Sequence, residues 1–444
     1  MVGDISFAFI ITVKNGGMLG FREAIESIKE MDYPFIKVHI LDATSEHDVE
    51  DYSKLLVNTD DRIEYHRMQP ALSMAALWNQ GIRYTREDYL IFVGPMVRLE
   101  ASMPRILAEY IASKLEVHIL YSDYDEIIDN VRMNPQFLPE FNLEYFRHTN
   151  YIGDTIVVKR QLFRQMGMFT ERLHFSFTYD FFLRAYENRL NILHVPHILW
   201  HSLTLEGENM SKGMREFLKK SLSEHKNVLM AHFSRLDIKA EVEPDQSLEY
   251  FKIKYYGDDY KAHRREYLLV RESGILVLKR RPIPILYGHL KQDDVAIVGV
   301  RFVGPRRTID NCGYIYDNEG MIYPACYGQQ AKSHGLYGRI AIPSDVSMVD
   351  PEYCMIDAKF FRKAGGFDRN LSGKEMMMDL CMQARKGGMR VVYEPMISVR
   401  RLSGESYSNE QVHNLFYSKW RTVIEKGDPY YNQNLPMGLS NYEL

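Results

Sequence analysis

The sequence has 444 residues, which is long enough for two or three domains with sizeable cores. Hydrophobic residues make up 45% and charged residues 26%, as in an ordinary globular protein, and the net charge of −4 gives no electrostatic case for a nucleic-acid partner. The 4 cysteines show no C-x-x-C pair and no metal-binding spacing, so we expect reduced cysteines in a cytoplasmic protein. No apolar run approaches the roughly 18 residues that span a bilayer.

The first ninety residues alternate between apolar runs and amphipathic runs. Apolar residues recur at helical spacing after residue 20, as at Phe21, Ala24, Ile25 and Ile28. We expect strands at 7–13, 36–41, 62–66 and 88–93, and helices at 21–29, 49–56 and 73–84. This alternation predicts an α/β fold with a parallel sheet and right-handed crossovers.

Acidic residues follow two of the apolar runs. Asp42 comes after the second strand, where α/β folds place a ligand crevice, although capping the turn before Thr44 and Ser45 would explain it as well. Asp123 and Asp125 come at the end of a later strand. Two carboxylates this close on a loop can share a metal or bind sugar hydroxyls, and a solvated acidic turn is the alternative.

The stretch between residues 121 and 201 contains an ordered series of short motifs. They are residues 121–126, Pro135 with Phe137 and Pro139, residues 150–153, Gly167 with Phe169, Asp180 with Leu183 and Arg184, and residues 199–201. In order and wording this stretch resembles the family 2 glycosyltransferases, GT-A fold enzymes that move a sugar from a nucleotide sugar to an acceptor. The resemblance is to a branch that assembles bacterial surface polysaccharide and often carries two such domains in tandem.

The resemblance implies roles for single residues. Asp42 matches an acid that contacts the uridine or ribose of the donor, and Asp123, Asp125 and Trp200 fall at donor- or acceptor-binding positions. His201 matches a histidine near the metal, although a lone histidine beside an aromatic residue is more often a hydrogen-bonded core residue.

Two landmarks of the resembled family are substituted here. The D-x-D that would hold Mg²⁺ or Mn²⁺ at the donor diphosphate is replaced by Gly94, Pro95 and Met96, so the implied metal cofactor lacks its carboxylates. The expected catalytic base is replaced by Thr178, which has no accessible pKa for that role. Asp180 is the catalytic candidate that remains, and it could equally favour the first turn of its helix through the helix dipole.

The second half of the sequence repeats the first. Residues 159–169 have an echo in residues 357–367, and Asp180 and Pro196 have echoes in Asp379 and Pro395 at a nearly constant offset. We therefore expect tandem GT-A domains. Only residues 257–265 separate the apolar run at 251–255 from the next one, which begins at 266. This stretch is too short for two strands and two crossover helices, so the second copy is predicted to lack its nucleotide-binding half.

The expected domains are a GT-A glycosyltransferase-like domain at 1–205, a helical connector at 206–245 that ends in a linker at 240–245, and a truncated GT-A-like domain at 246–444. The second domain has residues 271–274 where D-x-D would stand, Met377 at the base position and Arg400 with Arg401 in place of histidines. These substitutions indicate a structural or acceptor-binding remnant.

Three functions compete for this sequence. The first is sugar transfer from a nucleotide sugar to a glycan or lipid-linked acceptor in bacterial surface-polysaccharide assembly. The second is a catalytically degenerate pseudo-glycosyltransferase that binds nucleotide or glycan, and the third is a scaffold for an active transferase. Other glycosyltransferases or a second copy of the chain are the implied protein partners. The expected location is cytoplasmic, and the alternative is a peripheral position at the inner face of the membrane.

Overall fold

The computed structural model describes residues 4–153, 155–204, 212–245, 250–304, 306–335, 338–371, 373–403, 410–438 and 442. The chain forms two compact units, of which the first comprises Met1–Leu138 and Ile152–His232 and the second Pro139–Tyr151 and Phe233–Leu444. The expected domain boundary at 205/206 falls outside the described residues. The units divide instead at residue 232, and the short segment Pro139–Tyr151 joins the second unit.

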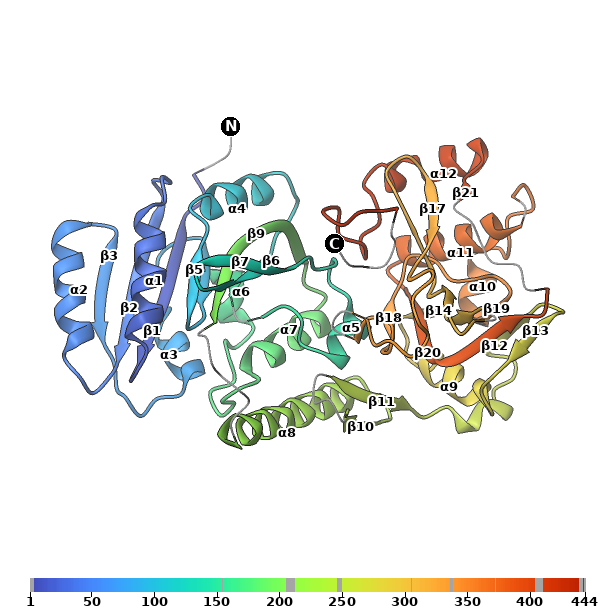
Figure 1. Cartoon of the computed structure of the whole chain (residues 1–444), viewed down its shortest axis with the longest axis horizontal. Coiled ribbons are helices and arrows are strands. Elements are labelled where there is room, and N and C mark those ends of the chain that lie inside the picture. The colour runs from blue at the N-terminus through green and yellow to red at the C-terminus, as the bar shows by residue number, and fades with distance from the viewer. Residues whose placement is uncertain are drawn as a thin grey trace. The chain divides into compact units, whose positions relative to one another are not determined.

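The sheet of the first unit has a parallel part and a mixed part (Figure 1). The strand order is β3-β2-β1-β4-β8-β6-β9-β5, and β7 pairs with β6. β1, β2, β3 and β4 pair in parallel, and β8 is antiparallel to β4. The bounds are β1 Phe7–Lys14, β2 Ile36–Ala43, β3 Ile63–Arg67, β4 Tyr89–Val93, β5 Val97–Leu99, β6 Ile119–Ile128, β7 Val131–Gln136, β8 Ile156–Lys159 and β9 Ile192–Thr204.

Helices cover both faces of this sheet, because alternate side chains of the buried strands point to opposite sides. Phe9 and Ile11 of β1 belong to one apolar core together with Phe21 of α1, whereas Trp78 of α3 stacks on Phe92 of β4 in a second, aromatic core. The helices are α1 Met18–Lys29, α2 Asp48–Thr59, α3 Met74–Gly81, α4 Met103–Ala112, α6 Arg160–Gln165, α7 Phe177–Glu187 and α8 Lys212–Arg235. The predicted alternation of strands and helices up to residue 93 is confirmed.

The sheet of the second unit repeats the mixed part of the first. Its order is β12-β19-β14-β20-β13 with β15 on β14, which matches β4-β8-β6-β9-β5 with β7 on β6. The pairing senses also agree, since β14 and β20 are parallel like β6 and β9. The bounds are β12 Tyr267–Arg271, β13 Ile275–Val277, β14 Val295–Val303, β15 Ile309–Asn311, β19 Tyr353–Asp357 and β20 Arg390–Arg401.

The sheet order ends at β12, where the first unit continues into β1, β2 and β3. Among the residues that the structure describes, the second unit has no counterpart of these three strands. The predicted α/β fold is therefore confirmed, and in the described residues its second sheet repeats part of the first. The remaining elements of this unit are η1 Asp258–Lys261, α9 Pro282–Leu290, β16 Tyr314–Tyr316, β17 Met321–Pro324, β18 Ser344–Asp345, α10 Ala358–Lys363, α11 Lys374–Lys386, β21 Glu410–Gln411 and α12 Asn414–Ile424.

The linker expected at 240–245 is instead a strand, so that prediction is wrong. β10 (Ala240–Pro244) pairs antiparallel with β11 (Phe251–Tyr255). Val242 lies opposite Ile253, and both are buried, while the acidic residues of β10 lie opposite the lysines of β11. Strands of this kind alternate apolar and polar residues, but β10 contains only one buried residue, Val242. The alternation in the sequence is therefore too short to predict the strand.

The segment that joins the second unit carries a short helix, α5 (Leu143–His148), whose six residues are all buried. Within this unit Glu144 accepts hydrogen bonds from Tyr255 Oη at 2.8 Å and from Arg390 Nη1 at 2.9 Å. The Arg390 guanidinium also binds both carboxylate oxygens of Asp294 at 2.9 Å and Asp345 Oδ1 at 3.1 Å. A single buried network thus joins α5 to the ends of β14, β18 and β20.

Burial alone would raise the pKa of Glu144, because a buried carboxylate loses its hydration. The nearby His148 and the charges of His289, Arg390 and Arg147 outweigh this effect, and they lower the pKa of Glu144 well below its usual value of 4.5. A lowered folded-state pKa stabilises the protein above the unfolded-state value. This stabilisation is lost as the pH falls below about 4.5 and through the folded-state pKa.

We expect Glu144→Gln to lower the free energy of unfolding by about 3 kcal/mol or more at pH 7, because it removes one of the carboxylate charges that balance the buried cations Arg147 and Arg390. Urea denaturation measures the effect. Glu319→Gln, which alters an exposed carboxylate of the same unit, is the control and should change stability by less than about 0.5 kcal/mol. Equal effects of the two substitutions would contradict a stabilising role for the Glu144 network.

Candidate active site

The carboxyl ends of β1, β2 and β4 meet at one edge of the first unit's sheet. Because β1 is parallel to both neighbours, Asp42 near the end of β2 and residues 94–96 after β4 lie at this same edge. Both therefore lie at the carboxyl edge of the parallel part of the sheet. α/β folds bind ligands in the crevice at this edge.

Asp42 is fully buried, and each of its carboxylate oxygens has protein partners. Oδ1 accepts hydrogen bonds from the backbone N–H of Thr44 at 2.9 Å and from its hydroxyl at 2.7 Å. Oδ2 accepts from the hydroxyl of Tyr65 at 2.7 Å and from Arg67, the register partner of Asp42 on β3. Burial and the bond to Asp42 raise the pKa of Tyr65 to about 12, so its hydroxyl remains a donor at neutral pH.

The loops after β1 and β2 are joined by side chains that sequence reasoning missed. Asn15 Nδ2 donates to Ser45 Oγ at 2.8 Å, and the backbone N–H of Ser45 donates to Asn15 Oδ1 at 2.8 Å. Both residues are exposed, so this bridge forms part of the solvent-facing rim of the sheet edge. Only the parallel pairing of β1 and β2 brings the two residues together.

The turn at residues 94–96 contains no carboxylate and is packed closely. Met96 adopts a left-handed conformation with φ 53°, and its carbonyl accepts a hydrogen bond from the N–H of Leu203 at 2.9 Å. A Cβ atom on Gly20 of α1 would lie 2.7 Å from Met96 N, so glycine is required where the helix passes this turn.

Asp123 and Asp125 were expected on a loop at a strand end, and this expectation is wrong. Both lie inside β6, which continues to Ile128 and pairs with β9 through register shifts on either side of Asp123. Asp123 is fully buried; its Oδ1 lies 2.7 Å from Nε2 of His194 and accepts the N–H of Leu138 at 2.8 Å. Irregular pairing, which periodicity does not reveal, extends the strand past these acids.

Asp125 and His201 form a hydrogen-bonded pair between β6 and β9, through Asp125 Oδ1 and His201 Nδ1. The other ring nitrogen, Nε2, lies 3.1 Å from Oε1 of Glu100. Arg132 donates to Asp125 Oδ2 at 2.7 Å and to Glu100 Oε1 at 2.8 Å, which closes a four-membered charged cluster. Both nitrogens of His201 face carboxylates, so the structure brings together two predicted residues and adds Glu100 and Arg132.

Trp200 projects to the opposite face of β9 from His201, because neighbouring strand residues alternate. Its indole is 5% exposed and stacks on the ring of Tyr124 with centroids 4.2 Å apart and an angle of 12°. It belongs to the apolar core that includes Leu99 and Leu199. The structure therefore does not bring Trp200 together with Asp125 and His201.

Asp180 lies in the first turn of α7 and is buried. Its Oδ2 accepts from the hydroxyl of Thr170 at 2.8 Å and from Nε of Arg184, one helical turn on, at 2.8 Å. Thr178 is also buried, and its hydroxyl has no hydrogen-bond partner among the described residues. Glu224 of α8 binds the N–H groups of the loop before α7, including Ser176 at 2.7 Å, a contact with no local sequence signal.

The echo of Asp180 in the second unit has the same kind of contact. Asp379 on α11 accepts a hydrogen bond from Gln383, one turn on, at 2.6 Å, and from the indole N–H of Trp420 at 2.8 Å. Arg401, which stands where the sequence comparison expected a histidine, binds Asp350 at 2.6 Å and Glu352 at 2.8 Å. In both units the repeated aspartate therefore accepts a hydrogen bond from a side chain one turn further along its own helix.

The second unit keeps a cleft beside the turn that corresponds to residues 94–96. Its volume is about 650 Å³. The lining includes Glu272, Ser273 and Gly274 of the turn together with Lys374 and Arg401. Ionic and hydroxyl side chains dominate this set, which suits a polar ligand.

Residues 8–95 match the model of the family described as Glycosyl transferase family 2. Over 40% of the chain the sequence is 27% identical to the O-antigen biosynthesis protein RfbC of Myxococcus xanthus, covering 14% of that protein. Over 98% of the chain it is 20% identical to the uncharacterized protein y4gI of Sinorhizobium fredii, covering 58% of it. The chain thus spans well under two thirds of either relative.

Solved structures give distant matches to about half of the chain. TarS 1–349 of S. aureus in complex with UDP-GlcNAc is 16% identical with a TM-score of 0.40, over 52% of this chain and 73% of that one. The mannosyltransferase PcManGT of Pyrobaculum calidifontis, in complex with GDP-Man and Mn²⁺, is 13% identical with a TM-score of 0.40, over 51% of this chain and 64% of that one. Among the described residues, no helix is long and apolar enough to cross a membrane.

We expect Asp125→Asn to lower the free energy of unfolding by about 1–3 kcal/mol, because the amide cannot accept from both His201 and Arg132 as the carboxylate does. Urea denaturation gives the value. The control is Glu126→Gln at the next position of β6, where the carboxylate is bonded to the neutral amide of Asn134. The cluster would have no stabilising role if both variants unfolded at the same urea concentration.

Proposed function

We propose that this chain transfers a sugar from a nucleotide sugar to a glycan acceptor in bacterial surface-polysaccharide assembly, since its residues 8–95 match the model of glycosyl transferase family 2. The observation that carries this proposal is the coincidence of the family match with the sheet edge around Asp42. The matched residues contain β1 to β4 and the loops that end at this edge. The relative from Myxococcus xanthus, an O-antigen biosynthesis protein, supports the glycan context.

The proposed donor site uses the charge of this edge. Arg67 keeps 39% of its side chain exposed, while Asp42 and Tyr65 hold it in place. Helix α1 starts after the loop that follows β1, with no acid in its first turn and no side-chain cap. A fixed guanidinium and the positive end of a helix both favour a diphosphate group. In this proposal the buried carboxylate of Asp42 positions Arg67 and the Thr44 loop around the nucleotide.

A divalent metal at the donor diphosphate does not fit the residues present. Residues 94–96 offer no carboxylate, and Asp125 and His201 are bonded to each other and to Arg132 and Glu100. We therefore propose a donor site that depends little on Mg²⁺ or Mn²⁺, with positive charge supplied by protein groups.

The proposed acid–base group is the cluster of Asp125, His201 and Glu100. Glu100 is 31% exposed, which gives an acceptor hydroxyl access to a carboxylate beside the imidazole. Asp180 remains a second candidate, and its bonds to Arg184 and Thr170 favour a structural role. The polar cleft of the second unit is the proposed contact for a glycan or lipid-linked acceptor, or for a partner transferase.

A pseudoenzyme that binds nucleotide or glycan without turnover is the alternative. The buried hydroxyl of Thr178 and the turn at residues 94–96 favour it, because neither supplies the base or the metal site of the family pattern. A scaffold without ligand binding is the third outcome that an experiment must separate.

We expect the full chain to bind a UDP, GDP or dTDP sugar with an affinity that changes less than about tenfold when Mn²⁺ is added. Isothermal titration with each donor, with and without Mn²⁺, measures this, and release of free nucleotide from the bound donor reports turnover. Binding with turnover supports a transferase, and binding without turnover the pseudoenzyme. Failure to bind any of the donors would leave the scaffold. Affinity that appears only with Mn²⁺ would contradict the proposed metal-light site.

We expect Asp42→Asn to weaken donor binding by about tenfold or more, since Arg67 loses its charged partner at the sheet edge. Asp60→Asn is a matched control: it removes an aspartate bonded to Arg62, but before β3, at the opposite end of the strand. The same titration on both variants decides the matter. If both variants lost affinity equally, the cause would be a general effect on folding. That result would contradict a donor site at the sheet edge around Asp42.

A further inference from the structure

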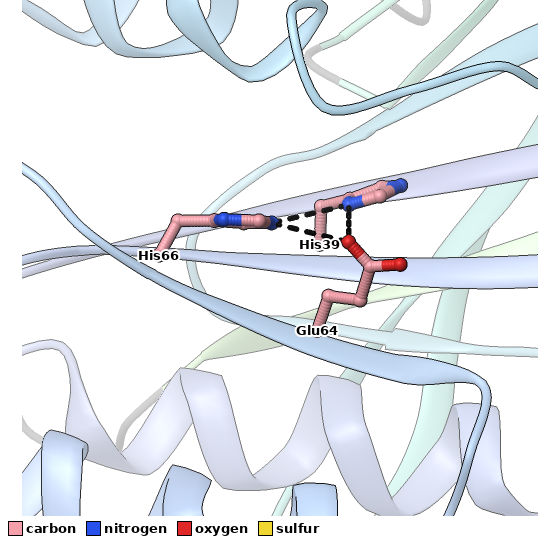
Figure 2. A group of neighbouring side chains, drawn as sticks. All are labelled: His39, Glu64 and His66. Atoms are coloured by element: carbon pink, nitrogen blue, oxygen red, sulfur yellow. Dashed lines mark hydrogen bonds and ion pairs between the residues drawn. The ribbon is translucent and has the colours of Figure 1, made fainter.

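Three metal-binding side chains converge on β2 and β3, outside the proposed donor site (Figure 2). His39 on β2 and Glu64 on β3 are register partners, and His66 lies two residues further along β3. All three therefore project from one face of the sheet. Among the described residues, this is the only group of three such side chains whose donor atoms all lie within 4.8 Å of one another.

The donor atoms form a triangle of the right size for a metal. His39 Nδ1 lies 3.3 Å from His66 Nε2 and 3.5 Å from Glu64 Oε2, and His66 Nε2 lies 3.7 Å from Glu64 Oε2. Ligands of a tetrahedral Zn²⁺ with bonds of about 2.0–2.1 Å are about 3.3–3.4 Å apart. The centre of the triangle lies about 2.0 Å from each atom, and a tetrahedral ion, displaced from the plane toward its fourth ligand, would lie about 2.2 Å from each, close to the usual bond lengths of zinc to nitrogen and oxygen.

A hydrogen bond between His39 Nδ1 and His66 Nε2 accounts for one side of this triangle, but not for the position of Glu64. A carboxylate bonded to an imidazole N–H is expected at about 2.7–3.2 Å. Glu64 Oε2 stays beyond that range from both rings, although it is close to both at once. The spacing is that of three ligands around a common centre.

The surroundings hold the two imidazoles in place. The side chain of His39 is 2% exposed, and its Nε2 points away from the triangle toward Oε2 of Glu87 at 3.8 Å. Histidine ligands commonly direct their second nitrogen to a carboxylate, which fixes the ring. The ring of His66 stacks on Tyr84 with centroids 3.7 Å apart. Glu64 is 47% exposed, so an ion and a water molecule can reach the group from solvent.

We infer that His39, Glu64 and His66 form a binding site for one divalent transition-metal ion, of which Zn²⁺ is the best match. Two histidines and one carboxylate suit zinc, and a water molecule would complete the tetrahedron. The carboxylate of Glu87 faces the other nitrogen of His39 from outside the coordination sphere, at 3.8 Å. The inference does not rest on the proposed sugar transfer.

A metal here would brace the strand that supports Asp42. β3 is at the end of the sheet order and pairs only with β2 there. Tyr65 and Arg67 flank His66 on β3 and project to the other face, where both bind Asp42. An ion shared by β2 and β3 would therefore fix the register that brings Arg67 to Asp42.

The test is zinc binding by the full chain after treatment with a chelator. We expect one Zn²⁺ per chain to bind at this group, with an affinity at least about tenfold lower in Glu64→Gln and in His66→Gln. Substituting residues that only hydrogen-bond a metal ligand already lowers metal affinity about tenfold, so loss of a ligand should lower it at least as far. Co²⁺ in place of Zn²⁺ should give the visible absorption of a tetrahedral site, and both variants should lose it.

His263→Gln is the control, because His263 also lies between two carboxylates, those of Asp259 and Glu266, but with one on each ring nitrogen. It should leave zinc affinity unchanged. Circular dichroism confirms that each variant is folded, which is expected for the half-exposed Glu64. The inference is overturned if the folded full chain binds no Zn²⁺, or if Glu64→Gln and His66→Gln bind it as tightly as the unaltered chain.

Discussion

The buried guanidinium of Arg390 is the interaction on which the second unit depends. It binds buried carboxylates from α5 and β18 and the partly exposed carboxylate of the residue before β14. A buried cation of this kind is tolerated only when all its partners are in place. The segment Pro139–Tyr151, which the sequence places between two strands of the first unit, therefore contributes a charged partner to the second unit. The chain thereby connects the two units at three points along its length.

This connection gives a physical reason for keeping a truncated repeat. The second sheet has the order and the pairing senses of β4-β8-β6-β9-β5 but ends at β12. A copy without the three parallel strands has lost the sheet edge where the first unit places Asp42. What it retains is a polar cleft and a core that receives α5. The second unit is therefore suited to stabilising the chain and to binding a polar partner.

In the first unit, the side chains with a proposed role in binding or proton transfer make hydrogen bonds or ion pairs with other ionisable side chains. Asp42 fixes Arg67, and Asp125 and Glu100 enclose His201 with help from Arg132. Such clusters keep side chains in one orientation before a ligand arrives, which lowers the cost of binding.

The sequence by itself determined the elements whose cause is local. Apolar spacing predicted β1 to β4 and the helices between them, and repeated motifs predicted the tandem fold with its shortened second copy. Only the tertiary structure placed Asp123 inside a strand, moved Pro139–Tyr151 into the second unit and brought His39 opposite Glu64. Periodicity depends on neighbours a few residues apart, whereas these features depend on strand register and on partners up to 246 residues away, as Arg390 is from Glu144.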